Sequence, residues 1–186
     1  MSGLRVIGGK ARGRKLRSVP GDSTRPITDR TKESLFNIIG GDIVGASFLD
    51  VFAGTGSVGI EALSRGAAYA RFLDLELQAV RTIRSNLEHT GLQDGAEVQR
   101  IDAFKLLAMA PDRRFDYVYI APPQYQTLWQ RTLRAIDAQT GWLSPDAWVI
   151  VQIHPKEYEA TPLDQLELFD QRHYGSTLLL FFQLQE

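Results

Sequence analysis

The spacing of hydrophobic and polar positions divides most of this chain into alternating strand and helix signals. Five short apolar runs have the length and composition of buried strands: residues 47–52, 69–75, 96–101, 115–120 and 147–153. Between them, apolar residues recur with a helical period over residues 57–65, 77–90, 103–110 and 127–138. Such alternation is typical of a parallel sheet with helices packed on it. We therefore predict an α/β fold with a mostly parallel sheet.

The two ends of the chain depart from this alternation. Residues 166–172 and 176–183 are both strand-like and are joined by Tyr174-Gly175, which predicts a closing hairpin and one antiparallel strand. Near the N-terminus, residues 4–10 and 11–19 predict a basic β-hairpin that bends at Gly8-Gly9. A helix capped by Thr28 or Asp29 should follow and end at Gly40-Gly41. We expect an extension over residues 1–24 and a main domain over residues 25–186.

Composition limits the classes of protein that the chain can belong to. Its 186 residues, 44% of them hydrophobic, suit one domain with a real core. The absence of cysteine excludes disulfides, thiolate metal sites and cysteine nucleophiles. The sequence shows no apolar run long enough to span a bilayer and no signal-peptide pattern, so we expect a cytoplasmic protein. The three histidines are scattered, and we expect no metal site.

Charge is distributed unevenly along the chain. The net charge is −1, yet the first 40 residues carry nine Lys or Arg against three Asp or Glu. A basic segment on a nearly neutral protein indicates a polyanion partner, although a solubilising arm is the alternative. The candidate contacts to nucleic acid are Arg5, Lys10, Arg12, Arg14, Lys15, Arg25 and Arg30.

The run from Phe48 to Gly59 holds the strongest chemical signal. A buried strand ends at Asp50, and a glycine-rich turn then leads into a helix that starts at Ser57. The glycine spacing also fits a nicotinamide or flavin fingerprint. An acidic residue at the strand end favours S-adenosylmethionine instead, because that donor carries an ammonium and a sulfonium. The alternative is a tight turn in which Asp50 only caps the strand.

Acidic residues also follow the next two strands. Asp74 comes about twenty residues after the glycine turn, which is the spacing of a carboxylate that accepts ribose hydroxyls. The alternative is that Asp74 caps the following helix. Asp102 could accept the adenine amino group while the Ala103 N–H donates to the ring, or it caps its own short helix. The candidate cofactor-binding residues are Asp50, Phe52, Ala53, Gly54, Thr55, Gly56, Gly59, Asp74, Leu75, Asp102 and Ala103.

The segment after the fourth strand predicts a rigid substrate loop. Two prolines fix the backbone and leave outward carbonyls that can hold an exocyclic amino group, while an aromatic ring beyond them can stack on a base. A stiff connector is the alternative. The candidate catalytic residues are Pro122, Pro123, Gln124 and Tyr125.

Four blocks of sequence together resemble the RsmD family of bacterial 16S rRNA guanine-N2 methyltransferases. They are residues 5–16, residues 25–30 with 33–37, residues 50–67, and Pro122-Pro123. The resemblance covers nearly the whole chain, and its first two blocks are specific to the family. It implies a seven-stranded, Rossmann-like class I methyltransferase fold, S-adenosylmethionine as donor, and a target guanine near the P site of the small subunit.

The chain departs from the family pattern at the substrate loop. The family has Asp-Pro-Pro followed by an aromatic residue, whereas this chain has Ala121 in place of the acid and Gln124 before Tyr125. An oriented polar contact of this kind is typically worth about 10²–10³ in rate. Gln124 offers a side-chain oxygen as a substitute acceptor for the guanine amine.

We therefore expect a monomeric enzyme that methylates 16S rRNA, either naked or in the assembled small subunit. Three alternatives remain open at this stage. Ala121 supports a catalytically weak or inactive RNA-binding or ribosome-assembly protein. A nicotinamide-dependent oxidoreductase fits the glycine spacing but not Asp50. A methyltransferase that acts on DNA or protein is also open, because only the family resemblance favours rRNA as the substrate over these.

Overall fold

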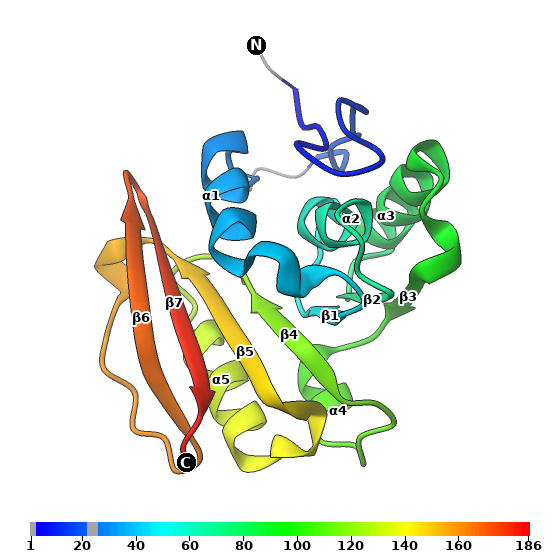
Figure 1. Cartoon of the computed structure of the whole chain (residues 1–186). Coiled ribbons are helices and arrows are strands. Elements are labelled where there is room, and N and C mark those ends of the chain that lie inside the picture. The colour runs from blue at the N-terminus through cyan, green and yellow to red at the C-terminus, as the bar shows by residue number, and fades with distance from the viewer. Residues whose placement is uncertain (1–2, 22–25) are drawn as a thin grey trace.

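A seven-stranded sheet forms the centre of the protein (Figure 1). The structure is a computed structural model and describes residues 3–21 and 26–186. The strands are β1 (Ser47–Asp50), β2 (Tyr69–Asp74), β3 (Ala96–Arg100), β4 (Phe115–Ile120), β5 (Leu143–Ile153), β6 (Leu166–Tyr174) and β7 (Thr177–Leu184). Their order is β3-β2-β1-β4-β5-β7-β6, and β7 runs antiparallel to both neighbours while the other pairs are parallel. The predicted fold class is confirmed.

Helices cover both faces of this sheet. They are α1 (Asp29–Ile39), α2 (Ser57–Ser64), α3 (Leu77–Thr90), α4 (Ala103–Leu107) and α5 (Leu128–Ala138), with short 3-10 turns at Gly40–Ile43, Gln93–Gly95, Thr140–Trp142 and Pro155–Glu157. As predicted, Thr28 caps α1, because its hydroxyl accepts the Thr31 N–H at 3.2 Å. No helix among the described residues is long and apolar enough to cross a membrane.

Alternation along the strands produces two hydrophobic clusters. Phe48 of β1 lies in the cluster with residues of α1, α2 and α3, whereas its neighbour Leu49 lies in the cluster with residues of α4 and α5. Successive strand side chains point to opposite faces, so each face receives its own helix layer. The chain winds outward from β1 in both directions, which places the switch point of the sheet at the carboxyl ends of β1 and β4.

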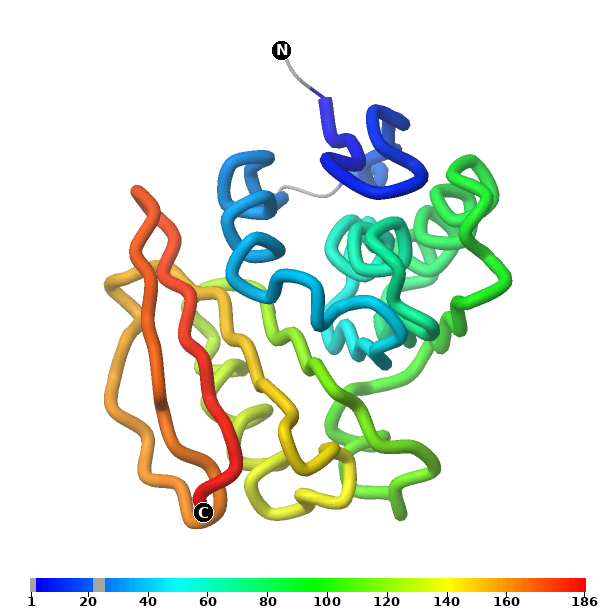
Figure 2. Tube along the Cα trace, in the orientation of Figure 1, coloured from blue at the N-terminus to red at the C-terminus, as the bar shows by residue number. Residues whose placement is uncertain are grey.

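The N-terminal segment, residues 3–21, differs from the regular hairpin that its sequence predicts. Its two arms pair through one isolated bridge, Arg5 with Lys15, and through backbone hydrogen bonds between residues 4–6 and 13–16. The chain reverses over residues 8–13 rather than at Gly8-Gly9. The apolar side chains Val6, Ala11 and Leu16 are buried in the cluster beneath α1–α3. The segment is also bound to α2, because the N–H groups of residues 7, 8 and 11 donate to side chains of that helix. Figure 2 shows it at one end of the molecule, beside the first helices.

Strand β5 begins four residues earlier than its apolar run predicts. Leu143 pairs with Phe115, and the next partners are Trp148 and Tyr117, so residues 144–147 bulge out of the register. The sequence Ser-Pro-Asp in this bulge looks like a turn, which hid the start of the strand. The remaining strands and helices lie within a few residues of their predicted bounds.

Candidate active site

The site is centred on Asp50, at the end of β1. Its side chain is buried, with 1% of the residue exposed, and its Oδ1 has no hydrogen-bond partner among the described residues. Burial raises the pKa of Asp50 to about 7, the Gly59 N–H opposes this shift, and the nearby Asp74 adds to it. A carboxylate in this state gains from a cationic partner, because such a partner compensates the ionised form that burial disfavours.

The glycine turn passes beside Asp50 and leaves room for a ligand. Gly54 and Gly56 both adopt left-handed backbone conformations, with φ of 57° and 81°. A side chain at Gly54 would meet no atom within 4 Å, so the space above the turn is open. Gly59 differs, since a Cβ there would lie 2.3 Å from the ring of Phe72 on β2. Its position favours helix–sheet packing and the bond to Asp50 over direct ligand contact.

Asp74, at the end of β2, holds the glycine turn in place. Its Oδ2 accepts the Gly54 N–H and its Oδ1 accepts the Glu76 N–H, both at 2.9 Å. Burial raises the pKa of Asp74 despite these two donors. Asp74 thus bonds the backbone of the glycine turn and of Glu76, the residue before α3, while the helix itself has no side-chain cap; its role at a ribose stays a prediction.

The other predicted cofactor residues lie just after β2 and β3 or within the glycine turn. Asp102 caps α4, because its Oδ1 accepts the Phe104 N–H at 2.7 Å, so its capping role is observed. Ala103 is buried at the start of that helix, whereas Leu75 is 56% exposed.

Within the turn, the Ala53 N–H donates to the Leu73 carbonyl at 2.9 Å. Phe52 packs against the cluster of α4 and α5, and the Thr55 hydroxyl accepts the Ser57 N–H at 3.2 Å.

The substrate loop follows β4 and contains two strained residues. Tyr125 and Thr127 have φ of 63° and 54°, a conformation that non-glycine residues rarely adopt. Gln124 is exposed, and Tyr125 is 65% exposed with its ring 6.2 Å from that of His154. Strain of this kind persists only when neighbouring groups hold the backbone. The exposed aromatic ring is available for stacking.

Glu157 is the holding group, and the sequence reasoning missed it. Its Oε1 accepts the Tyr125 N–H at 2.7 Å, and its Oε2 accepts the His154 N–H at 3.1 Å. The residue closes a capping box over Pro155–Glu157, directly after β5. The sequence His-Pro-Lys-Glu carried that capping signal, but nothing in it pointed to a loop more than 30 positions away.

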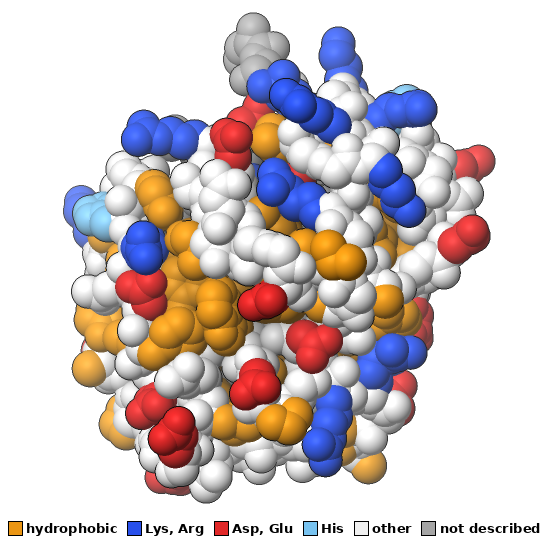
Figure 3. All heavy atoms as spheres, viewed as in Figure 1, with side chains coloured by type: hydrophobic (Ala, Val, Ile, Leu, Met, Phe, Trp, Pro, Cys, Tyr) orange, Lys and Arg blue, Asp and Glu red, His pale blue; other side chains and the backbone are white. Residues whose placement is uncertain are grey.

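Basic side chains gather over the N-terminal segment and the start of α1 (Figure 3). The strands β4 and β5 point towards this same end of the molecule (Figure 1). The exposed predicted contacts there are Arg5, Lys10, Arg12, Arg14, Lys15 and Arg30. Arg5 forms an ion pair with Asp29 at 2.9 Å, and Arg25 lies outside the described residues. The cationic surface and the predicted site thus share one end of the sheet.

Comparison with known proteins agrees with this geometry. The family model described as "Conserved hypothetical protein 95" matches residues 4–183. The chain is 40% identical over 158 residues to "Putative rRNA methyltransferase YlbH" of Bacillus subtilis, covering 84% of this chain and 85% of that protein. It is 36% identical over 149 residues to "Ribosomal RNA small subunit methyltransferase D" of Escherichia coli strain K12, covering 80% and 74%. A solved structure, "Putative methyltransferase yhhF from Escherichia coli", superimposes with a TM-score of 0.85 at 32% identity and covers 98% of each chain.

Proposed function

The chain belongs to the RsmD family, and on that basis we propose that it methylates the exocyclic N2 of a guanine in 16S rRNA, near the P site of the small subunit. The methyl donor is S-adenosylmethionine, which supplies an already activated methyl group when it is bound. The protein must therefore bind two substrates, align them and exclude water; it needs neither a covalent intermediate nor a strong base.

The unpartnered Oδ1 of Asp50 is the observation that carries this proposal. Capping does not explain a buried carboxylate oxygen that accepts no hydrogen bond from the described residues and lies beside an open glycine turn, and its charge complements the ammonium and sulfonium of the donor. A nicotinamide cofactor offers no such positive charge next to its pyrophosphate. Asp50 and the backbone of Gly54–Gly56 would hold the methionine end, and Asp74 would face the ribose.

The substrate loop supplies what the target amine needs. The carbonyls of Ala121 and Pro122 and the side-chain oxygen of Gln124 can accept hydrogen bonds from the guanine N2, which orients its lone pair. The exposed ring of Tyr125 would stack on a base that has left its own stack. Glu157 supports this arrangement because it fixes the backbone of Tyr125.

Phosphate contacts from the basic end of the molecule would hold the RNA. The side chains of Lys10, Arg12, Arg14 and Lys15 are exposed on the N-terminal segment, and Arg30 is exposed on α1. Arginine and lysine at such positions bind phosphates without reading sequence. Selection of one guanine must then come from RNA shape and from the substrate loop.

A second candidate function rests on Ala121. Its side chain cannot accept a hydrogen bond, so a protein that binds donor and RNA without transferring the methyl group is the competing proposal. The two proposals share the cofactor site and the RNA surface, and they differ only in turnover.

Incubation of unmodified small subunits with labelled S-adenosylmethionine, followed by nucleoside analysis, tests the proposed function. We expect N2-methylguanosine, and the Asp50→Asn variant should lose both donor binding and product. Donor and RNA binding without any methylated nucleoside would select the non-catalytic candidate. A methyl group on another nucleoside would refute the guanine-N2 assignment.

A further inference from the structure

Asn86, on α3, joins the N-terminal segment to the glycine turn. The residue is fully buried. Its Oδ1 accepts the Arg17 N–H at 2.8 Å, and its Nδ2 donates to the Arg17 carbonyl at 3.1 Å and to the Thr55 carbonyl at 2.9 Å. One amide side chain thus binds the backbone of both segments, which lie 38 positions apart in the sequence. Without this amide, each of the three partly buried backbone groups would lose that hydrogen bond.

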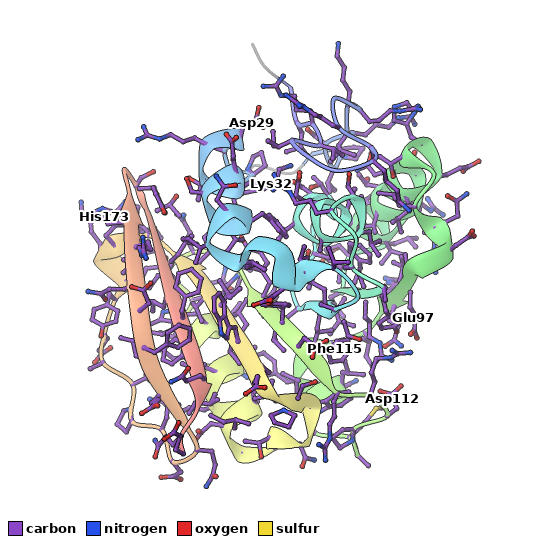
Figure 4. The ribbon with its side chains drawn as sticks, in the orientation of Figure 1. Asp29, Lys32, Glu97, Asp112, Phe115 and His173 are labelled. Atoms are coloured by element: carbon purple, nitrogen blue, oxygen red, sulfur yellow. The ribbon has the colours of Figure 1, made fainter. Side chains whose placement is uncertain are left out.

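A second buried side chain, Lys32, makes a similar connection from α1. Its Nζ donates to the Arg5 carbonyl at 2.6 Å and to the Ser57 hydroxyl at 3.0 Å, so it bonds the segment and the first residue of α2. It also lies 3.5 Å from Glu61, whose two oxygens accept the Ile7 and Gly8 N–H groups at 2.9 Å. Figure 4 shows Lys32 and Asp29 on the end of α1 that adjoins the segment.

The segment has backbone hydrogen bonds of its own between residues 4–6 and 13–16, and it is also bound closely to these helices. It contains one isolated bridge, and Gly9 packs so closely on α2 that a Cβ there would lie 1.9 Å from the Ser64 carbonyl oxygen. Among the side chains that the structure describes, several hold the segment, and Asn86 is the one that also bonds the glycine turn. A change in the order of the turn can therefore reach the segment through the hydrogen bonds of Asn86.

We propose that Asn86 is a positioning residue that couples occupancy of the cofactor turn to the order of the basic N-terminal segment. This inference rests on the proposed function only in taking S-adenosylmethionine to bind at the glycine turn. A ligand at the turn fixes the Thr55 carbonyl, and this carbonyl holds the Asn86 amide in place. The amide then holds the backbone of Arg17 and, through it, the basic residues before it. Because coupling is reciprocal, RNA bound to the segment tightens the donor by the same factor. The basic N-terminal segment is therefore fully ordered only when S-adenosylmethionine occupies the glycine turn.

Hydrogen exchange measured by mass spectrometry tests this coupling without RNA and without turnover. The probe is S-adenosylhomocysteine, and the readout is the exchange rate of peptides covering residues 3–18, with and without the probe. Couplings between sites are typically about 5–150-fold, and we expect exchange in this segment to slow by about tenfold on binding. Peptides from residues 143–149, on the far part of the sheet, should not change.

Two variants separate positioning from simple loss of stability. Asn86→Ala should abolish the probe-dependent change while S-adenosylhomocysteine still binds. Thr90→Val is the matched control, because Thr90 is buried one turn later on α3 and its hydroxyl bonds only carbonyls of its own helix. It should lower stability and keep the probe-dependent change intact.

The possible results are distinct. If S-adenosylhomocysteine binds the wild-type protein and exchange in residues 3–18 stays the same, the inference is overturned and the proposed function stands. If Asn86→Ala keeps the full effect, the role of Asn86 is overturned. The wild-type measurement decides the coupling even if that variant does not fold. Failure of the wild type to bind the probe would overturn the proposed function, and the inference with it.

Discussion

Replacing Asp50 by asparagine should stabilise the protein at alkaline pH while it removes donor binding. Asparagine keeps the size and shape of the side chain but cannot carry a charge. In the wild-type protein, burial raises the pKa of Asp50 from 3.8 to about 7. Above pH 7 the native protein must therefore hold an ionised carboxylate in a buried place, which the variant avoids.

The expected size follows from the pKa difference between the folded and unfolded states. Between about pH 4 and pH 7 the native protein binds one more proton at Asp50 than the unfolded chain, so the free energy of unfolding falls as pH rises through this range. The full loss, present above pH 7, is about 4 kcal/mol. Asp74 and Tyr119, the titratable neighbours linked to Asp50, remain in both proteins, so they largely cancel in a comparison.

Thermal unfolding of both proteins at pH 5 and pH 8.5 is the assay. At pH 5, about one unit above the pKa of the unfolded carboxyl, about 1.6 kcal/mol of this loss is already present, so the variant should melt higher by roughly 3–6 °C. At pH 8.5 the variant should melt higher by roughly 8–16 °C, since 1 kcal/mol corresponds to about 2–4 °C in a domain of this size. Calorimetric titration with S-adenosylhomocysteine should show lost affinity in the variant. A stability difference that is the same at both pH values would refute the reasoning about burial.

Three further predictions concern packing, RNA contact and turnover. Gly59→Ala places a Cβ 2.3 Å from an aromatic ring of β2 and should lower the free energy of unfolding, measured in urea, by about 1–3 kcal/mol. The control is Gly41→Ala, whose Cβ meets no atom within 4 Å and which should be nearly neutral. Equal effects of the two variants would contradict the packing role of Gly59. Binding of a single-stranded rRNA fragment should weaken as the salt concentration rises. The double variant Arg12→Ser/Arg14→Ser should reduce the slope of log K against log salt concentration by about 1.4. An unchanged slope would mean that the RNA binds elsewhere on the protein. Gln124→Ala should lower kcat much more than donor affinity, by about 10²-fold if its oxygen is the substitute acceptor, and unchanged turnover would reject that role.

The sequence alone determined the local features of this protein. Apolar periodicity predicted the strand–helix alternation, and Thr28 predicted the start of α1, because both depend on neighbours within a few positions. Asp50 and Asp74 each lie at the end of a predicted strand, so we expected them at the same edge of the sheet, since the carboxyl ends of parallel strands lie together. The family resemblance added the seven-stranded fold, which the sheet order confirmed.

The tertiary structure decided which distant groups bond to one another. The packing of Gly59 against β2, the support of Tyr125 by Glu157, and the attachment of residues 3–21 to buried side chains of three helices join positions far apart in the chain. No periodicity or capping rule encodes such pairs, because their partners meet only after the sheet has assembled. The same reason explains why the basic segment is a packed part of the domain rather than the regular hairpin its own residues predict.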